Sequence, residues 1–213
     1  MTLKSFDLGF SAGISCIRIG YFYDSESPSF VCASQNGEVK IISLDETLQE
    51  YELNAQFDLS ENGAIWSIEC VDLNADGKDE LIIGGMQGAV VCITSKGDEL
   101  WVHKCDSAIS GLYIWHNHGL DFETPAIVIY SLDRTIRVLN GDGKMIWAQM
   151  FASGVACVCS GDINNDSQEE IVAGGNDGTI RAFEGKTGKL LWFLDLKARS
   201  EEHTSELQSP NTI

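Results

Sequence analysis

The sequence has few prolines and few basic residues, and it lacks any long hydrophobic run. Only 3 prolines occur in 213 residues, and 14 Lys and Arg stand against 32 Asp and Glu, which gives a net charge of −18. Because a chain this acidic offers no basic stripe to a polyanion, we expect no nucleic-acid partner and no anionic membrane surface as a partner. The apolar runs are short and broken by polar residues, so we also expect no membrane insertion.

The sequence also lacks the usual signs of export and of zinc binding. Its first ten residues, MTLKSFDLGF, contain no long apolar stretch of the kind found in signal peptides. The 7 cysteines form no Cys-x-x-Cys pair and alternate with apolar residues, as in SFVCAS and GVACVCSG. We therefore favour reduced, buried cysteines in a cytoplasmic protein over a disulfide framework.

What is present is an internal repeat. The pattern Gly-x-x-x-Trp occurs at 97–101, 143–147 and 188–192, with starts 46 and 45 residues apart. Each unit holds four short runs of β-branched and aromatic residues, separated by turns such as SKGD and NGDGK. Four strands in about 46 residues are typical of a propeller blade. The sequence predicts an all-β fold, a β-propeller with four recognisable blades of four antiparallel strands, at about 11–60, 61–107, 108–153 and 154–198.

The end of the chain differs from the repeat. Residues 199–209, RSEEHTSELQS, resemble the in-frame translation of a sequencing-library adapter. We expect 199–213 to be a non-native, disordered tail and exclude it from the fold. Closed propellers have roughly four to eight blades. Because the non-native tail follows the fourth blade directly, the four blades are expected to be a truncated part of a larger propeller.

Two acidic loops recur 90 residues apart, which is two blade lengths. DLNADGKDE occupies 72–80 and DINNDSQEE occupies 162–170. Alternate residues of a tight loop can direct oxygen atoms at one centre, and Ca²⁺ takes roughly six to eight oxygen ligands. The candidate ligands in the first loop are Asp72, Asn74, Asp76, the carbonyl of Lys78, and Glu80. Those in the second loop are Asp162, Asn164, Asp166, the carbonyl of Gln168, and Glu170.

The loops admit a second interpretation without metal. Gly77 at the sixth position permits a sharp bend, and Ser167 takes that position in the second loop. An EF-hand is excluded, because its twelfth position needs a glutamate and here it is Ile83 or Ala173. The alternative to calcium is a strand-connecting turn whose Asp and Asn side chains accept backbone N–H groups. Either role is structural, because no nucleophile or base accompanies the loops.

These loops and the strands that follow them resemble the FG-GAP/VCBS repeat found in integrin α-chain propellers. The matching stretches are CVDLNADGKDELIIGGMQGAVVCI and SGDINNDSQEEIVAGGNDGTIRAF, whereas 11–60 and 108–153 lack the acidic loop. The resemblance implies that the acidic loop joins the first two strands of a blade and can hold structural calcium. The Gly-x-x-x-Trp element, as in EGKTGKLLW, is also similar to blades of quinoprotein-type propellers.

The tryptophans divide into two groups. Trp101, Trp147 and Trp192 recur once per blade at one position, which indicates packing between blades rather than a ligand site. Trp66 and Trp115 lie in predicted first strands, near the channel of a propeller. They are the candidates for exposed aromatics, although burial in the core is the default expectation for both.

No motif for catalysis is present, neither a phosphate-binding loop, nor Gly-x-Ser-x-Gly, nor His-Glu-x-x-His. We identify no catalytic and no cofactor-binding residue, and we expect a non-enzyme. The predicted function is a scaffold that mediates protein–protein interaction with other subunits of an intracellular complex, similar to propeller subunits of BBSome-like complexes. One alternative is a calcium-stabilised extracellular propeller for adhesion or carbohydrate binding, which needs export. The other is a quinoprotein-like enzyme.

Overall fold

The alternating apolar stretches form β-strands, and the Gly, Asn and Asp residues between them form tight turns. The computed structural model describes residues 7–23, 27–44, 50–116 and 124–196. These ranges contain sixteen β-strands and one turn of 3-10 helix. Within them no helix has the length and apolar character needed to traverse a bilayer. The predicted non-native tail, 199–213, lies outside the described residues.

The strands form four sheets of four strands each, which we call blades 1 to 4 in chain order. Blade 1 consists of β1 (Ile14–Gly20), β2 (Ser29–Ser34), β3 (Glu38–Leu44) and β4 (Tyr51–Asp58). Blade 2 consists of β5 (Ile65–Val71), β6 (Glu80–Gly85), β7 (Ala89–Ile93) and β8 (Glu99–Lys104). Blade 3 consists of β9 (Ile109–Trp115), β10 (Ala126–Ser131), β11 (Thr135–Leu139) and β12 (Met145–Met150). Blade 4 consists of β13 (Val155–Gly161), β14 (Glu170–Gly175), β15 (Thr179–Glu184) and β16 (Leu190–Asp195).

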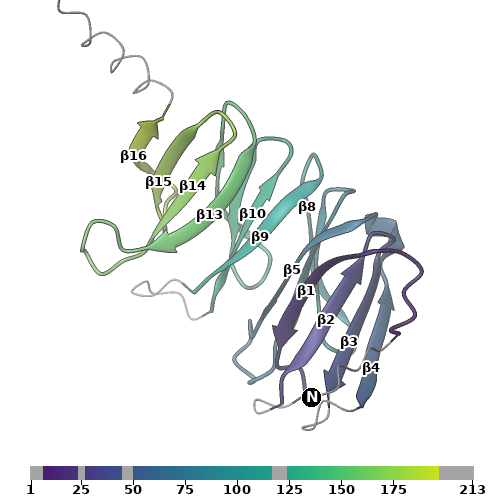
Figure 1. The fold of residues 1–213 in the computed structure, drawn as a ribbon. Helices are drawn as coiled ribbons and strands as arrows, with labels where there is room; N and C mark the ends of the chain where they lie inside the picture. The colour runs from purple at the N-terminus through teal and green to yellow at the C-terminus, as the bar shows by residue number, and fades with distance from the viewer. Residues whose placement is uncertain (1–6, 24–26, 45–49, 117–123, 197–213) are drawn as a thin grey trace, which may run out of the picture.

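Each blade is an antiparallel meander whose strands pair in chain order. The first strands of the blades lie side by side, with β1 against β5, β5 against β9, and β9 against β13. Figure 1 shows the blades succeeding one another from the N-terminal to the C-terminal part of the chain. Four-stranded sheets arranged in this way are propeller blades. The predicted all-β propeller fold with four antiparallel blades is confirmed.

We call the face of blades 2 to 4 that packs on the preceding blade the back face, and the opposite face the front face. The same names are used for the equivalent faces of blade 1. Side chains alternate along a strand, so neighbouring residues serve opposite faces. Strand β6 of blade 2 is buried along its whole length, because blades 1 and 3 cover both faces. Strand β16, at the edge of blade 4, is exposed or half-buried at every position. Burial therefore depends on which neighbouring blades are present.

The core runs through the contacts between blades. The cluster between blades 2 and 3 includes Leu73, Ile82 and Cys92 from the front face of blade 2, and Ile127, Ile129 and Leu139 from the back face of blade 3. The cluster between blades 3 and 4 includes Val128, Val138 and Trp147 from blade 3, and Ile171, Ala173 and Phe183 from blade 4. Residues at equivalent strand positions thus form each contact between blades. Each blade therefore carries apolar residues at the same positions, and the sequence repeats.

The cysteines follow the prediction only in part. All of them are free, and Cys32 and Cys92 are buried within blades 1 and 2. Cys157 and Cys159 are exposed, so the expectation that every cysteine is buried is wrong at these two positions. Both lie on β13. Strand β9 lies on one side of β13, and among the described residues no first strand lies on its other side. The alternation of apolar residues correctly indicated a strand. Among the described residues, however, no neighbouring element buries the Cys157 and Cys159 side chains.

Candidate functional site

The two ends of the propeller differ in chemistry. What we call the acidic end carries the connections from first to second strands, including both acidic loops, 72–80 and 162–170. It also carries the hairpin turns that precede the fourth strands. What we call the turn end carries the tight turns between second and third strands and the links from one blade to the next. Candidate sites occur at both ends.

The side chains of the first acidic loop accept hydrogen bonds from the backbone of the same loop. Asp72 accepts the backbone N–H groups of Asn74 and Asp76 at 3.3 and 3.2 Å. Glu80 is 3% exposed and accepts the N–H of Leu73 at 2.8 Å and the side-chain amide of Asn74 at 3.1 Å. Burial raises the pKa of the Glu80 carboxyl, although the bond from Leu73 opposes that rise. The loop is thus ordered by carboxylate–backbone bonds.

The second acidic loop has the same internal pattern. Asp162 accepts the N–H of Asp166 at 3.2 Å, and Glu170 accepts the N–H of Ile163 at 3.0 Å and the side-chain amide of Asn164 at 3.1 Å. A cavity of about 60 Å³ lies beside this loop. Its lining includes four of the five predicted ligands, Asn164, Asp166, Gln168 and Glu170.

Both loops bend at the position that the sequence predicts. Gly77 and Ser167 have φ angles of 82° and 68°, in the left-handed region. Ala75 and Asn165, two residues earlier, also have positive φ, of 60° and 61°. The loops therefore contain two left-handed residues each, and composition indicated only one of them.

The donor atoms suit calcium, but their present positions satisfy the backbone. All predicted ligands are oxygens, and a carboxylate oxygen that accepts one N–H keeps a second lone pair. The N–H groups of Lys78 and Gln168 bond to Asp76 and Asp166 at 2.9 and 2.8 Å, as expected of a turn without metal. Across the described ranges, no three His, Cys, Asp or Glu side chains are placed so that they could hold a metal ion. Calcium binding stays a prediction.

The eighth residue of each acidic loop reaches the preceding blade. Asp79 accepts the backbone N–H of Tyr21 in blade 1 at 2.8 Å, and its own N–H bonds to the Tyr21 carbonyl at 2.7 Å. Glu169 accepts the indole N–H of Trp115 in blade 3 at 3.0 Å. Burial raises the pKa of the Asp79 carboxyl. Sequence reasoning missed these contacts; the only signal was an acid at position eight in both loops.

A second contact between blades joins each fourth strand to the next hairpin turn. The indole N–H of Trp101 donates to the Gly141 carbonyl at 2.9 Å, and that of Trp147 donates to the Gly185 carbonyl at 2.7 Å. A Cβ atom at Gly143 would lie 2.5 Å from the Trp101 ring, and one at Gly188 would lie 2.5 Å from the Trp147 ring. The tryptophan ring of one blade therefore packs against the glycine of the Gly-x-x-x-Trp motif in the following blade. This confirms packing between blades for Trp101 and Trp147, whereas Trp192 is 48% exposed, so the same prediction is wrong there among the described residues.

The turn end presents large apolar side chains. Trp66 is 42% exposed and lies at a bulge near the start of β5, between the paired residues Ile65 and Ser67. Met86 and Leu132, in the tight turns of blades 2 and 3, are 45% and 55% exposed.

The exposure of the two candidate aromatics separates them. Trp66 is exposed, against the default expectation of core burial, because the bulge turns it out of the alternation of its strand. Trp115 is fully buried, and its indole bonds to Glu169. Core burial, the default expectation for both, therefore holds for Trp115, which belongs to the contact between blades 3 and 4.

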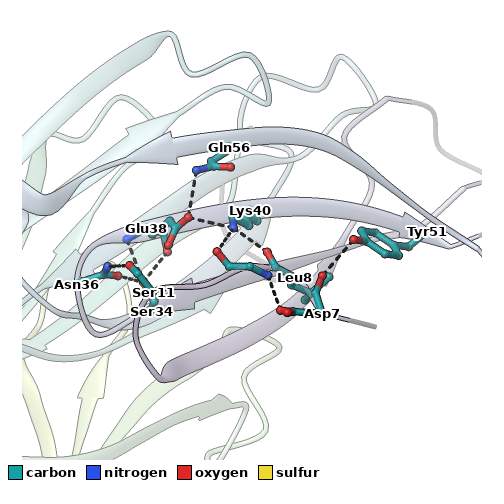
Figure 2. Close-up of polar contacts among 10 residues, drawn as sticks. Asp7, Leu8, Ser11, Ser34, Asn36, Glu38, Lys40, Tyr51 and Gln56 are labelled. Atoms are coloured by element: carbon teal, nitrogen blue, oxygen red, sulfur yellow. Dashed lines mark hydrogen bonds and ion pairs between the residues drawn. The ribbon is translucent and has the colours of Figure 1, made fainter. Parts of the chain in front are cut away.

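The N-terminal segment, residues 7–11, lies across the back face of blade 1, as Figure 2 shows. Lys40, which is 4% exposed, donates from Nζ to the carbonyls of Leu8 and Gly9 at 2.7 and 3.1 Å, and Nζ lies 4.4 Å from the centre of the Phe10 ring. Glu38 pairs with the same ammonium at 3.0 Å. A buried cation is thereby paired and hydrogen-bonded, which offsets its desolvation.

The contact at the N-terminal segment repeats one between blades 3 and 4. There Arg181 donates to the Met150 carbonyl at 3.1 Å, and its guanidinium lies 4.2 Å from the centre of the Phe151 ring. The sequences agree as well, FSAGI at 10–14 and FASGV at 151–155. The N-terminal segment thus occupies on blade 1 the place that the end of a preceding blade occupies on blade 4.

Comparison with known proteins assigns the family. The family model of the lambda-carrageenase beta-propeller domain matches residues 30–147, which is more than half of the chain. The chain belongs to the lambda-carrageenase beta-propeller family. The matched residues run from β2 to Trp147 and include the first acidic loop and the Trp101–Gly143 contact. No curated protein sequence matches the chain.

Solved structures show the fold of this lambda-carrageenase-type propeller in other proteins. A structure of BBS1N in complex with ARL6DN, soaked with lead, is 11% identical with a TM-score of 0.63, and covers 92% of this chain and 56% of that chain. The same complex soaked with mercury is 12% identical with a TM-score of 0.64, and covers 89% and 56%. BamB from Moraxella catarrhalis is 19% identical with a TM-score of 0.60, and covers 91% and 51%. The chain therefore spans about half the length of these proteins.

Proposed function

We propose that this propeller is a non-catalytic scaffold that binds other protein subunits in a cytoplasmic complex. The observation that supports this proposal is the apolar set Trp66, Met86 and Leu132 at the turn end, each more than 40% exposed. Trp and Met are enriched in protein interfaces, and Trp is one of the residue types enriched at their energetic centres. A propeller of the same fold, BBS1N, has been solved in complex with ARL6DN. We include in the proposal that the repeats are of the FG-GAP/VCBS type.

The charge of the chain favours the turn end over the acidic end as the docking surface. The acidic end carries Asp72, Asp76, Asp162 and Asp166, whose carboxylates bond within their own loops. Burying such charges against a partner is costly unless the partner is basic. The apolar side chains of the turn end gain free energy on burial, at about 25 cal/mol per Å².

Replacing Trp66 and Met86 with aspartate is expected to abolish partner binding without unfolding the chain. Both side chains are exposed, so their loss removes interface contacts and leaves the blade core intact. The measurement is affinity capture from extract of the source cells with the full chain as bait, quantified by mass spectrometry. A partner held by this face should fall at least tenfold, since such residues contribute about 2 kcal/mol or more.

The matched control is Leu100→Asp, an equally exposed position (49%) on the outer strand β8, away from the turn end. It should retain the partner. Equal recovery of the same partner by wild type and by the Trp66/Met86 variant would contradict the proposal.

A carbohydrate ligand is the second candidate function. The observation that favours it is membership of a propeller family named for a carrageenase, since an exposed tryptophan such as Trp66 can also stack on a sugar ring. Quenching of tryptophan fluorescence by carrageenan oligosaccharides, absent in Trp66→Ala, would support this candidate over the scaffold.

Calcium is proposed as a structural ligand of the acidic loops. Addition of 100 times the dissociation constant should raise the free energy of unfolding by about 2.7 kcal/mol, because the unfolded chain holds no preformed loop. The measurement is thermal unfolding in CaCl₂ against EDTA. Asp72→Asn with Asp76→Asn should remove the effect of the first loop, and Asp162→Asn with Asp166→Asn that of the second. A melting temperature that does not respond to calcium would exclude both sites.

A further inference from the structure

Blade 1 departs from the repeat on the back face of its two outer strands. Two residue pairs there join β3 to β4, with Glu38 opposite Asp58 and Lys40 opposite Gln56. The equivalent pairs carry other side chains, which are Ala89–Lys104 and Val91–Val102 in blade 2, Thr135–Met150 and Arg137–Ala148 in blade 3, and Thr179–Asp195 and Arg181–Phe193 in blade 4. The repeat therefore does not explain why blade 1 gathers two acids, a lysine and an amide at these positions.

These positions border a polar cleft of about 260 Å³. Ser11 comes to it from the N-terminal segment, Asn36 from the tight turn between β2 and β3, and Ser60 from the 3-10 turn η1 (Ser60–Asn62). Figure 2 shows how Ser11, Asn36, Glu38 and Gln56 lie around Lys40. The lining consists of two hydroxyls, two amides and two carboxyls: Ser11, Asn36, Glu38, Gln56, Asp58 and Ser60.

The cleft lies toward the outer rim of the propeller, where a preceding blade gives little cover. At the positions of Gln56 and Asp58, the other blades expose large side chains, although a preceding blade packs on each of them. The exposed fractions are 40% for Val102, 64% for Met150 and 49% for Phe193. Contacts between blades thus leave this part of the back face open, and a ligand from outside can reach it.

The buried lysine beside the cleft has no donor left for a ligand. An ammonium group carries three N–H donors. Those of Lys40 meet the carbonyls of Leu8 and Gly9 at 2.7 and 3.1 Å and the Glu38 carboxylate at 3.0 Å. An anion in the cleft would therefore face Asp58 without a free cation from Lys40, so the cleft does not suit an anionic ligand.

Acceptor oxygens of the cleft, in contrast, stay available. Glu38 accepts Lys40 and the Gln56 amide N–H, at 3.0 Å each, on the same oxygen, Oε1, so Oε2 keeps its lone pairs. A carboxylate only accepts, so the amide nitrogen of Gln56 faces Glu38 and the amide oxygen remains an acceptor.

Asp58 is a charged group without a cation beside it. It accepts the backbone N–H of Ser60 at 3.0 Å, and it makes no ion pair among the residues that the structure describes. The hydrogen bonds from Ser60 hold the pKa of the Asp58 carboxyl below its ordinary value, so the group is ionised at neutral pH. The cleft thus offers one uncompensated negative charge next to neutral acceptors.

We propose that this cleft binds the cationic side chain of an arginine or lysine from a basic peptide segment. A guanidinium or ammonium group only donates hydrogen bonds, which matches the open oxygens of Glu38, Gln56 and Asp58. The net charge of −18 also attracts a basic segment to the chain. The site is distinct from the apolar set of the turn end, and the proposal holds whether or not that set binds a partner.

The test titrates the full chain with acetyl-Gly-Arg-Gly-amide and follows side-chain amide resonances by NMR. Those of Gln56 and Asn36 should shift and saturate with a dissociation constant of about 1 to 10 mM. Acetyl-Gly-Lys-Gly-amide should bind at the same place, and the tighter of the two peptides identifies the preferred cation. Absence of a saturable shift with both peptides would overturn the proposal.

A peptide with citrulline in place of arginine separates charge from shape, because citrulline is neutral and nearly isosteric. It should bind at least about threefold more weakly than the arginine peptide. Equal shifts with the citrulline peptide would overturn the assignment to a cation.

Two variants locate the site. Asp58→Asn keeps the shape of the side chain and removes its charge, and should weaken binding of the arginine peptide by about three- to fivefold. The matched control is Asp195→Asn, which removes the same charge at the equivalent position of blade 4, where Thr179 stands in place of Glu38. It should bind the peptide as wild type does. Equal weakening by both variants would show an effect of net charge alone and would overturn the site.

Calcium is the competing occupant of a site with two carboxyls. CaCl₂ at constant ionic strength should leave the side-chain amide resonances of Gln56 and Asn36 unchanged. If calcium shifts them at lower concentration than the arginine peptide does, and Asp58→Asn abolishes that shift, the cleft is a metal site and the proposal is overturned.

Discussion

Replacing Trp147 with alanine is expected to lower the free energy of unfolding by about 3 to 5 kcal/mol, the range for large aromatic residues removed from a core. The side chain is 7% exposed, its ring centre lies 5.8 Å from that of Phe183, and its indole N–H bonds to the Gly185 carbonyl at 2.7 Å. Truncation leaves a cavity between blades 3 and 4 and a carbonyl without its donor. Urea unfolding followed by circular dichroism measures the change.

The chain supplies its own control for this result. Trp192→Ala changes the same residue at the same blade position, but the side chain is 48% exposed. Its expected effect is within about 1 kcal/mol. Equal losses for the two variants would show that Trp147 acts through strand propensity rather than through the contact with blade 4. Gly188→Val should reproduce most of the loss from the opposite side, because Gly188 has a φ of 68° and faces the Trp147 ring.

Replacing Asp133 with asparagine is expected to lower the free energy of unfolding at neutral pH by about 2 kcal/mol. Burial by itself would raise the pKa of Asp133, but hydrogen bonds from Arg137 and Ser131 outweigh it and lower the pKa to about 2. Arg137 donates to the two carboxylate oxygens at 3.2 and 2.7 Å, and the carboxylate side chain is only 13% exposed. The charged form is therefore held in the folded state.

The sign of the pH dependence follows from this lowered pKa. The stabilisation by Asp133 is fully present above the unfolded-state pKa of about 3.9 and is lost as pH falls through about 2. The difference between wild type and Asp133→Asn should thus be constant from about pH 7 to 5, fall steeply toward pH 2, and approach zero below about pH 2. Urea unfolding of both proteins at each pH gives the difference directly. A difference that persists unchanged at pH 2 would contradict the electrostatic origin.

Asp177 of blade 4 is the matched control for Asp133. It occupies the same position before a Thr-Ile-Arg stretch, but its ion pair with Arg181 is longer, at 3.7 Å. Asp177 Oδ2 and Arg181 Nε are buried without a hydrogen bond, whereas both oxygens of Asp133 are bonded. The pKa of Asp177 is lowered, chiefly by the hydrogen bond from Thr179. Asp177→Asn should therefore destabilise the chain less than Asp133→Asn.

Local sequence signals predicted the strands and turns well. Alternation of apolar residues marks each strand because successive side chains face opposite sides of a sheet. The glycines at 97, 143 and 188 mark hairpin turns because all three adopt positive φ. The bend of each acidic loop was placed correctly on the same grounds, at Gly77 and Ser167. These features depend only on residues near one another in the chain.

Features that depend on a neighbouring blade escaped prediction. Asp79 and Glu169 look like ordinary acids in a turn, and only the packing of blades brings them to Tyr21 and Trp115. Trp66 and Trp115 were both candidates for exposed aromatics with core burial as the default, and only Trp115 is fully buried. A bulge near the start of β5 turns Trp66 outward, whereas Trp115, at the end of β9, is held by its contact with the next blade.

By itself, the sequence determined that this protein repeats a four-stranded antiparallel unit, because the spacing of turns and the alternation of side chains act within one blade. Only the tertiary structure decided which copies of the repeated tryptophan are buried. Trp101, Trp147 and Trp192 share one motif. The first two pack against the following blade and donate a hydrogen bond to it, whereas the third is exposed. The reason is that burial requires a partner surface, and a partner surface is a property of the assembled blades rather than of any single repeat.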